Sequence, residues 1–337
     1  MERNVQMIRF FSGKRPRILC LLLITVLMTG CASQQISQQF TLDSSVSAFT
    51  LSSPGGVDLG EGRAQAFAHD LCLRDDATLS SNSVDLSQAL SGILCDVNKH
   101  RVIYAKDENM QLPPASLTKV MTALVALDNC TLDETLTASE NVKINESGAT
   151  LCGLEPGDTM TMDQALHALL MQSANDAAIM IAEHVGGSVE GFAQMMNDKA
   201  KSLGATGCNF VNPHGLTADG HLVTAYDMYL IFAAAMQYET FTSIIHMDHY
   251  DTVYHDAQGN GKSYETATTN LFLKGDYQSP EGITVVGGKT GTTTAARNCL
   301  VLLSRDSAGN PYVAVILGAS ERQYLYQEMV SLLGKIG

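Results

Sequence analysis

The sequence predicts an α+β fold in which strands from both ends of the globular part share one sheet and a helical subdomain is inserted between them. Two observations lead to this prediction. Short apolar runs of strand type lie after residue 90 and again after residue 284, whereas helical patterns fill the region between residues 116 and 204. Blocks of strands and helices that do not alternate are typical of α+β domains.

The strand predictions rest on two hairpin patterns. The stretch "SGILCDVNKHRVIYAKD" (91–107) has two apolar runs separated by Asn98, Lys99 and His100, which favour a turn. Near the other end, "NCLVLLSR" and "PYVAVILG" flank the turn sequence "DSAGN". The segment "SERQYLYQEMVSLLGKI" then predicts a closing helix over residues 320–336.

Four helices are predicted in the middle of the chain. The first, from residue 116 to about residue 127, is apolar on nearly every side, so we expect it to be buried all round. "MDQALHALLMQ" predicts the second. "NDAAIMIAEHVGG" predicts the third and "SVEGFAQMMNDKAKSLG" the fourth, and glycines end both segments.

The N-terminal region predicts export rather than part of the fold. Basic residues precede an apolar segment of 11 residues (18–28), so residues 1–30 fit a secretory signal. The segment ends in "LMTGC", which resembles a bacterial lipobox and predicts a lipid on Cys31 and an extracytoplasmic, membrane-anchored lipoprotein. The alternative is an ordinary signal peptide, a secreted protein and an incidental cysteine. Residues 31–67 are rich in Ser, Gln and Gly and predict a flexible tether, which leaves residues 68–337 as one catalytic domain.

Charge and cysteine content exclude some classes of function. The net charge of −14 argues against nucleic acid as a partner, because phosphate binding needs a clustered positive surface. No CxxC pair is present, and His246, His249 and His255 follow no metal-binding spacing, so we expect no metal site. Sequence alone does not pair the six cysteines beyond Cys31: Cys72, Cys95, Cys130, Cys152, Cys208 and Cys299.

The stretch "PPASLTKV" places Ser116 and Lys119 three residues apart at a predicted helix start. Residues with this spacing share a helix face, and the first turn offers free backbone N–H groups. Burial lowers the pKa of a lysine, so Lys119 could act as the base that activates Ser116 as a nucleophile. The alternative is a helix cap with a solvent-exposed lysine, but the mostly apolar helix leaves little exposed surface.

Two later motifs fit the same kind of site. "QSANDAA" offers the Ser173 hydroxyl as a proton relay and the Asn175 amide for a substrate peptide, although a helix cap would explain the motif alone. In "VVGGKTGTT", glycines that include Gly291 leave room for another backbone beside a strand. Lys289 and Thr290 would then face a carboxylate. No dinucleotide or Walker pattern surrounds these glycines.

The three motifs in this order, S-x-x-K, S-x-N and K-T-G, are typical of penicillin-binding proteins and serine β-lactamases. Over residues 90–337 the chain resembles the low-molecular-weight D-alanyl-D-alanine carboxypeptidases, with "LEPGD" and "NPHGL" as further matches. The resemblance implies a serine β-lactamase/D,D-peptidase-like fold, with an antiparallel sheet flanked by helices. It also implies a serine-type hydrolase that trims peptidoglycan stem peptides ending in D-Ala-D-Ala and needs no metal or cofactor.

The resemblance also implies roles for the site residues. Ser116 would attack the carbonyl between the two D-alanines, Lys119 would take its proton, and Ser173 would pass a proton to the departing nitrogen. Asn175 would hold the substrate peptide. β-Lactams would acylate Ser116 as substrate mimics.

The K-T-G strand would hold the other end of the substrate. Lys289 and Thr290 would bind or orient its terminal carboxylate, and Gly291 would allow it to approach. The backbone N–H groups of Ser116 and Thr292 would form the oxyanion hole.

Some positions depart from the family pattern or lie outside the three motifs. Arg297 stands where relatives usually have glycine, and we expect it on the same strand as Lys289. Arg322 matches a site arginine of the family. We expect His214 to be structural and Asp227 to be a helix cap.

Two other functions remain open from the sequence. A class A β-lactamase would share the three motifs, but the glutamate segment E-x-x-L-N that such enzymes use is missing between Asn175 and Lys289. A β-lactam sensor or wall-binding lipoprotein without turnover would keep the pocket. The preference for carboxypeptidase or endopeptidase substrates also stays open.

Overall fold

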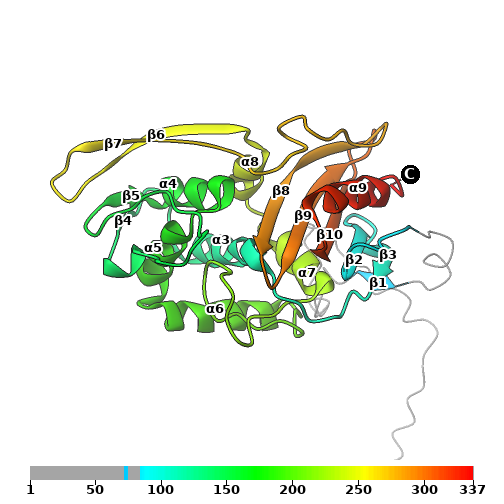
Figure 1. Cartoon of the computed structure of the whole chain (residues 1–337), viewed down its shortest axis with the longest axis horizontal. Helices are drawn as coiled ribbons and strands as arrows, with labels where there is room; N and C mark the ends of the chain where they lie inside the picture. The colour runs from blue at the N-terminus through cyan, green and yellow to red at the C-terminus, as the bar shows by residue number, and fades with distance from the viewer. Residues whose placement is uncertain (1–71, 75–83, 337) are drawn as a thin grey trace, which may run out of the picture. The chain divides into compact units, whose positions relative to one another are not determined.

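The computed structural model describes residues 72–74 and 84–336 (Figure 1). The predicted signal segment, the tether and Cys31 lie outside these residues. Among the described residues, no helix is both long and apolar enough to cross a membrane.

A six-stranded sheet joins the two ends of the described chain, as the sequence predicts. Its order is β1-β3-β2-β10-β9-β8, and its neighbours are antiparallel except for the parallel pair β1 and β3. The two predicted hairpins are confirmed as β2 with β3 and as β9 with β10. The strands are β1 (Leu73–Arg74), β2 (Ser91–Asp96), β3 (Arg101–Lys106), β8 (Thr284–Thr293), β9 (Arg297–Arg305) and β10 (Pro311–Ala319).

Both faces of this sheet are buried, and alternate side chains along a strand enter different cores. On β9, Val301 and Leu303 pack into the core shared with the central helices, whereas Leu300 and Leu302 pack with α9 (Arg322–Leu333). The helix α7 (Ala225–Ala235) contacts the sheet on the first of these faces (Figure 1). The sheet is therefore the middle layer between a terminal helix and a helical subdomain.

The inserted subdomain contains the predicted helices. The first begins as a 3₁₀ turn, η1 (Ala115–Leu117), and continues as α3 (Thr118–Asn129), whose residues 118–126 are all buried, as predicted. The third and fourth are α5 (Asn175–Gly186) and α6 (Val189–Ser202). The second is α4 (Met162–His167), which runs into the π-helical turn η3 (Ala168–Gln172).

Apart from a helix start near Asp227, the sequence did not predict several elements of the subdomain. These are the helices α7 and α8 (Glu239–His246), the 3₁₀ turn η2 (Glu140–Val142) and a second sheet of order β4-β5-β6-β7. Its strands are β4 (Thr135–Thr137), β5 (Thr159–Thr161), β6 (His249–His255) and β7 (Gly261–Ala267). The hairpin β6–β7 extends away from the six-stranded sheet (Figure 1). Every second residue of both strands is exposed, so few apolar residues mark these strands in the sequence.

Candidate active site

The S-x-x-K serine lies where η1 meets α3, against the edge strand β8. Ser116 is the middle residue of the 3₁₀ turn, and Ala115 before it has a φ of 48°, a left-handed conformation that is costly for alanine. The Ala115 carbonyl accepts a hydrogen bond from Thr118 Oγ1 at 2.8 Å. Local contacts therefore hold the serine in a bent turn instead of a regular helix.

A buried histidine supports this turn from the other side. Thr118 Oγ1 lies 2.8 Å from His221 Nε2, and the Val211 backbone N–H donates to His221 Nδ1 at 3.0 Å. Because Nδ1 accepts and Thr118 Oγ1 donates to Ala115, the ring must carry its proton on Nε2 and donate it to Thr118. Burial lowers the pKa of His221 to about 4, so the ring stays neutral at pH 7.

Lys119 lies one turn into α3 with its whole side chain buried. Its Nζ is 3.0 Å from Ser116 Oγ, and it donates to Asn175 Oδ1 at 2.7 Å and to the His214 carbonyl at 2.6 Å. Burial, followed by the charge of Lys289, holds the pKa of Lys119 well below its usual value, and Asp176 opposes this effect.

A neutral amine has two hydrogens and one lone pair. The Asn175 carbonyl oxygen and the His214 carbonyl can only accept hydrogen bonds, so they take both hydrogens of neutral Lys119. The lone pair then remains for the Ser116 hydroxyl at 3.0 Å. The contacts around Lys119 therefore suit a base that removes a proton from Ser116.

The S-x-N residues lie at the break between η3 and α5. Ser173 has a φ of 72°, in the left-handed region, and it ends the π-helical turn. This conformation places its hydroxyl where Lys289 Nζ donates to it at 3.0 Å. Asn175 begins α5, and its backbone N–H is held by the Thr150 carbonyl at 2.8 Å.

Lys289 lies on β8 and is only 1% exposed. Its Nζ donates to Ser173 Oγ at 3.0 Å and to the Thr290 carbonyl at 2.9 Å. Burial lowers the pKa of Lys289 to about 7, so the group can lose its proton near neutral pH. An anionic ligand beside it would favour the charged form.

The following residues of β8 approach the serine turn closely. A Cβ on Gly291 would lie 2.9 Å from Ser116 N and 3.1 Å from both Ala115 Cβ and the Pro114 carbonyl oxygen. Only glycine therefore allows the strand to lie this close to the backbone of the nucleophile. Thr290 Oγ1 is 2.6 Å from Thr269 Oγ1, and Thr292 is exposed with its Oγ1 3.3 Å from Asn298 Oδ1.

The structure thus connects most of the predicted site residues directly. Ser116, Lys119 and Asn175 form one hydrogen-bonded group, and Ser173 and Lys289 form a second. Lys289 affects the pKa of Lys119, so the two groups share one electrostatic environment. The Thr290 carbonyl accepts from Lys289, but the side-chain hydroxyls of Thr290 and Thr292 contact Thr269 and Asn298, outside these groups, and their substrate roles stay predictions.

Three contributing residues were not predicted from the sequence. His214 was expected to be structural, but its carbonyl oxygen holds Lys119. Asp176 accepts from the backbone N–H groups of residues 152, 153 and 154 at 2.9–3.0 Å and raises the pKa of Lys119. Thr269 contacts Thr290. The motif "NPHGL" drew attention to His214 in the sequence. The hydrogen bond to Lys119 uses the backbone carbonyl of His214, however, and every residue type has such a carbonyl.

Other positions lie away from these contacts. Arg297 is exposed and begins β9, so the expectation that it shares a strand with Lys289 was wrong; the chain turns after Thr293. Arg322 is exposed at the start of α9. Asp227 is in the first turn of α7, but Thr224 is the residue that caps this helix.

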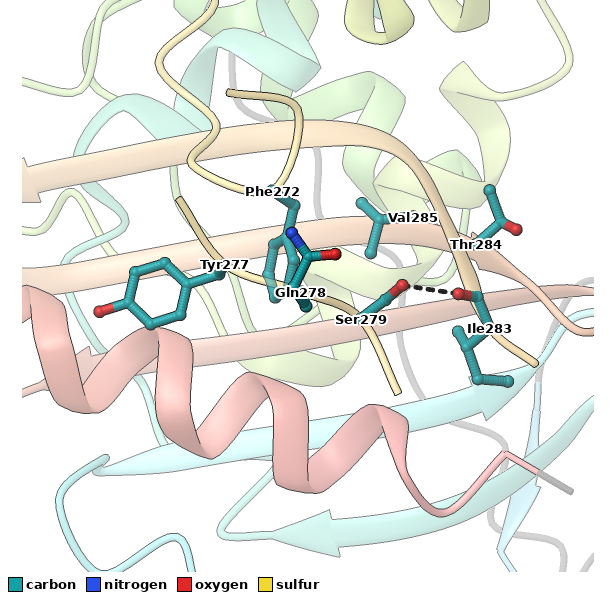
Figure 2. A pocket seen from close by; sticks show the side chains of 7 residues that line it. All are labelled: Phe272, Tyr277, Gln278, Ser279, Ile283, Thr284 and Val285. Atoms are coloured by element: carbon teal, nitrogen blue, oxygen red, sulfur yellow. Dashed lines mark hydrogen bonds between the residues drawn. The ribbon is translucent and has the colours of Figure 1, made fainter. Parts of the chain in front are cut away.

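A shallow hollow lies elsewhere on the sheet (Figure 2). It is lined by Phe272, Tyr277, Gln278, Ser279 and residues 283–285, and Tyr277 stacks on Tyr326 of α9 with ring centroids 4.7 Å apart. None of the three motifs contributes to it. The hollow therefore lies on the face of the sheet that α9 covers and is separate from the serine-lysine site.

Known proteins share sequence similarity with most of this chain. The family model described as D-alanyl-D-alanine carboxypeptidase matches residues 78–321. The chain is 35% identical over 240 residues to the D-alanyl-D-alanine carboxypeptidase DacF of Bacillus subtilis, which covers 69% of this chain and 58% of DacF. It is 33% identical over 232 residues to DacB2 of Mycobacterium tuberculosis, with 68% of this chain and 75% of DacB2 covered.

Solved structures give the same fold. The Streptomyces K15 DD-transpeptidase superposes with a TM-score of 0.68 at 24% identity, covering 74% of this chain and 96% of that one. A third curated relative, DacC of Escherichia coli, is 31% identical over 267 residues, which is 77% of this chain and 62% of DacC. The chain therefore spans about three fifths of the length of DacF and DacC.

Proposed function

The chain belongs to the D-alanyl-D-alanine carboxypeptidase family, and from this we propose that it is a penicillin-binding serine carboxypeptidase that removes the terminal D-alanine of peptidoglycan stem peptides. The observation that carries the proposal is the position of Lys119. Its Nζ lies 3.0 Å from Ser116 Oγ while two carbonyl oxygens occupy its hydrogens. A serine with such a base at hydrogen-bonding distance is prepared for acyl transfer.

In the proposed acylation, Ser116 Oγ attacks the carbonyl carbon between the two D-alanines while Lys119 takes its proton. The carbonyl oxygen becomes negative, and the backbone N–H groups of Ser116 and Thr292 stabilise it. One such donor contributes about 3–4 kcal/mol to the transition state in comparable sites. Collapse of this tetrahedral intermediate breaks the C–N bond. The proton that Lys119 took from Ser116 reaches the leaving nitrogen through Ser173. Water then cleaves the ester of Ser116.

Lys289 supports this reaction at the other end of the substrate. Without substrate, Lys289 donates a hydrogen bond to Ser173. A substrate carboxylate at this position would pair with the charged form of Lys289. Asn175 would contact the substrate peptide while its Oδ1 holds Lys119. Binding the carboxylate next to the relay serine would therefore align the scissile bond with Ser116.

Incubation with a pentapeptide stem ending in D-Ala-D-Ala, read by mass spectrometry, tests the proposal. We expect loss of one D-alanine, and we expect a fluorescent penicillin to label the protein at one site. Ser116→Ala should abolish both, whereas Ser331→Ala, an exposed serine on α9, should change neither. Fast hydrolysis of penicillin without peptide cleavage would instead indicate a β-lactamase. Stable labelling without peptide cleavage would indicate a sensor or wall-binding protein.

We also propose that the protein is anchored to the extracytoplasmic side of the membrane by a lipid on Cys31. The apolar segment before Gly30 and Cys31 supports this proposal. The protein should fractionate with membranes, and Cys31→Ala should release it or leave the signal segment attached. A wild-type protein that is secreted freely, with a mature N-terminus other than Cys31, would contradict the anchor.

A further inference from the structure

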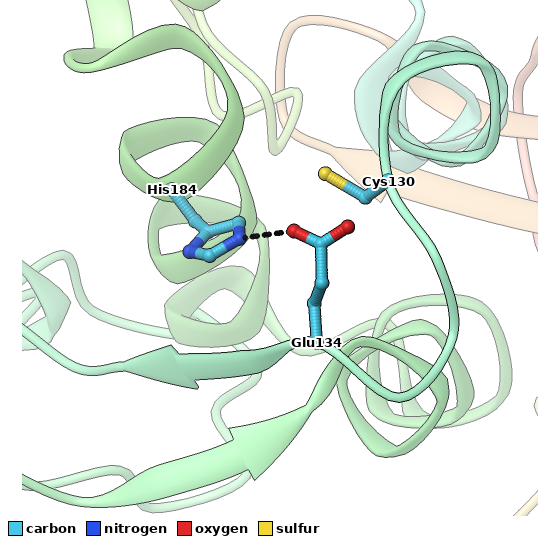
Figure 3. Close-up of side chains that lie close together, drawn as sticks. All are labelled: Cys130, Glu134 and His184. Atoms are coloured by element: carbon cyan, nitrogen blue, oxygen red, sulfur yellow. Dashed lines mark hydrogen bonds and ion pairs between the residues drawn. The ribbon is translucent and has the colours of Figure 1, made fainter.

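Three side chains with metal-binding chemistry converge far from the active site (Figure 3). Cys130 directly follows α3, Glu134 directly precedes β4, and His184 lies in the last turn of α5. The ligand atoms of all three lie within 4.8 Å of one another, and His184 Nε2 is 3.0 Å from Glu134 Oε2. The residues are 4 and 50 positions apart, so no short sequence motif indicates the cluster.

This set of donors matches the preferences of zinc. Zn²⁺ binds thiolate, imidazole and carboxylate with bonds of about 2.0–2.3 Å, which places the ligand atoms of a tetrahedral site about 3.3–3.7 Å apart. The His184 Nε2 to Glu134 Oε2 distance of 3.0 Å is just below this range, and no separation in the cluster exceeds 4.8 Å, so small side-chain movements would complete the site. A His–Glu ion pair alone would not need the thiol.

The position of Glu134 is fixed by a neighbouring residue. Its Oε1 accepts from the Thr131 backbone N–H at 2.7 Å and from Thr131 Oγ1 at 3.3 Å, so Oε2 is the oxygen that faces His184. Hydrogen bonds of this kind orient carboxylate ligands in metal sites. Burial, followed by the negative charge of Glu134, raises the pKa of the Cys130 thiol. A cation between them would reverse this unfavourable effect of the carboxylate on a thiolate.

We propose that Cys130, Glu134 and His184 bind one Zn²⁺ ion, with water as the fourth ligand. His184 is exposed, so the ion can enter from solvent. Cys130 and Ser116 lie at opposite ends of the same helix, roughly 20 Å apart at 1.5 Å per residue, so the ion cannot touch the reacting atoms.

The ion would cross-link two helices. It would join the C-terminal ends of α3 and α5, which pack against each other. The other ends of these helices carry Lys119 and Asn175, whose hydrogen bond depends on how the helices are spaced. The site would therefore stabilise the subdomain that holds the catalytic lysine.

Cobalt titration of the purified, metal-free, reduced full chain tests the site. We expect one equivalent of Co²⁺ to give tetrahedral d–d bands and a thiolate-to-cobalt charge-transfer band, and Zn²⁺ to displace it. Zn²⁺ should also raise the thermal unfolding midpoint. Cys130→Ser should abolish the charge-transfer band, and Glu134→Gln and His184→Gln should each weaken Zn²⁺ binding at least about 10-fold. Thr131→Val should weaken it less than these changes, because it removes only the longer of the two hydrogen bonds that orient Glu134 and keeps the backbone one.

Cys208→Ser is the matched control, because Cys208 is also a half-buried thiol but contacts only the Ala205 carbonyl among described hydrogen bonds. This variant should keep the spectrum and the affinity of wild type. Retained penicillin labelling shows that each variant is folded. The proposal is overturned if wild type gives no charge-transfer band, or if Cys130→Ser keeps it. It is also overturned if Zn²⁺ raises the unfolding midpoints of wild type and the Cys130, Glu134 and His184 variants equally.

Discussion

Lys119 and Lys289 are both buried, and each has a serine hydroxyl 3.0 Å from its Nζ. The charge of Lys289 is the second cause, after burial, of the lowered pKa of Lys119. Lys119 must be neutral to accept a proton, whereas Lys289 must be charged to bind a carboxylate. The two lysines therefore divide the roles of base and anion binder, although they have the same side chain.

The pH dependence of penicillin acylation should follow from this pair. The value of kcat/KM should rise as Lys119 loses its proton, at a pH well below the usual lysine pKa, and fall as Lys289 loses its proton above about pH 7. In Lys289→Gln the rising limb should move to higher pH, because the charge that disfavours protonated Lys119 is removed. Stopped-flow acylation across pH measures both limbs. A rising limb that stays in place would show that the charge of Lys289 does not affect the pKa of Lys119.

Asp176→Asn should have the opposite effect on the rising limb. The Asp176 carboxylate raises the pKa of Lys119, so its neutralisation should lower that pKa further and move the limb to lower pH. The variant should also lose about 1–3 kcal/mol of unfolding free energy, because an amide cannot satisfy all three backbone donors of residues 152–154. Acylation profiles and urea unfolding measure the two effects. Shifts of the limb in the same direction in Asp176→Asn and Lys289→Gln would contradict the electrostatic account.

Gly291→Ala should impair acylation more than folding. The new Cβ would lie 2.9 Å from Ser116 N and would push β8 away from the serine turn, which displaces the predicted oxyanion donor of Thr292. We expect a loss of about 10²–10³-fold in acylation rate, the effect of one oxyanion donor. Gly334→Ala is the control, because its Cβ would meet atoms only at 3.4 Å or more. Equal acylation rates in Gly291→Ala and wild type would show that this close approach has no role.

The sequence predicted the parts of the fold that depend on strong apolar patterns. The buried helix α3 and the hairpins β2–β3 and β9–β10 are examples, because each element contains a run of buried apolar residues. The second sheet was missed because β4 and β5 have three residues each and alternate threonine with one apolar residue. A pattern of that length does not distinguish a strand from a loop.

The same contrast holds in the site. The motifs identified Ser116, Lys119 and Lys289 because chemistry depends on their side chains. The left-handed backbone of Ser173 and the carbonyl of His214 are set by tertiary packing, so residue type does not reveal them. The sequence analysis also considered a lowered pKa for Lys119 and not for Lys289. Burial of Lys289 to 1% exposure lowers its pKa as well.

His221 should make the protein sensitive to mild acid. Its pKa is about 4 in the folded protein because of burial, compared with about 6.5 when unfolded. Between these values only the unfolded chain takes up the proton, so this residue lowers the unfolding free energy by about 1.4 kcal/mol for each pH unit as the pH falls from 6.5 to 4.

His221→Gln removes this titration. Urea unfolding at several pH values should therefore give a shallower decline for the variant, from a lower stability at pH 7 because the contacts to Thr118 and Val211 are weakened. Because Thr118 supports the turn of Ser116, penicillin acylation of the variant should also be slower at pH 7. Parallel stability curves for the two proteins would show that His221 does not stay neutral in the folded state.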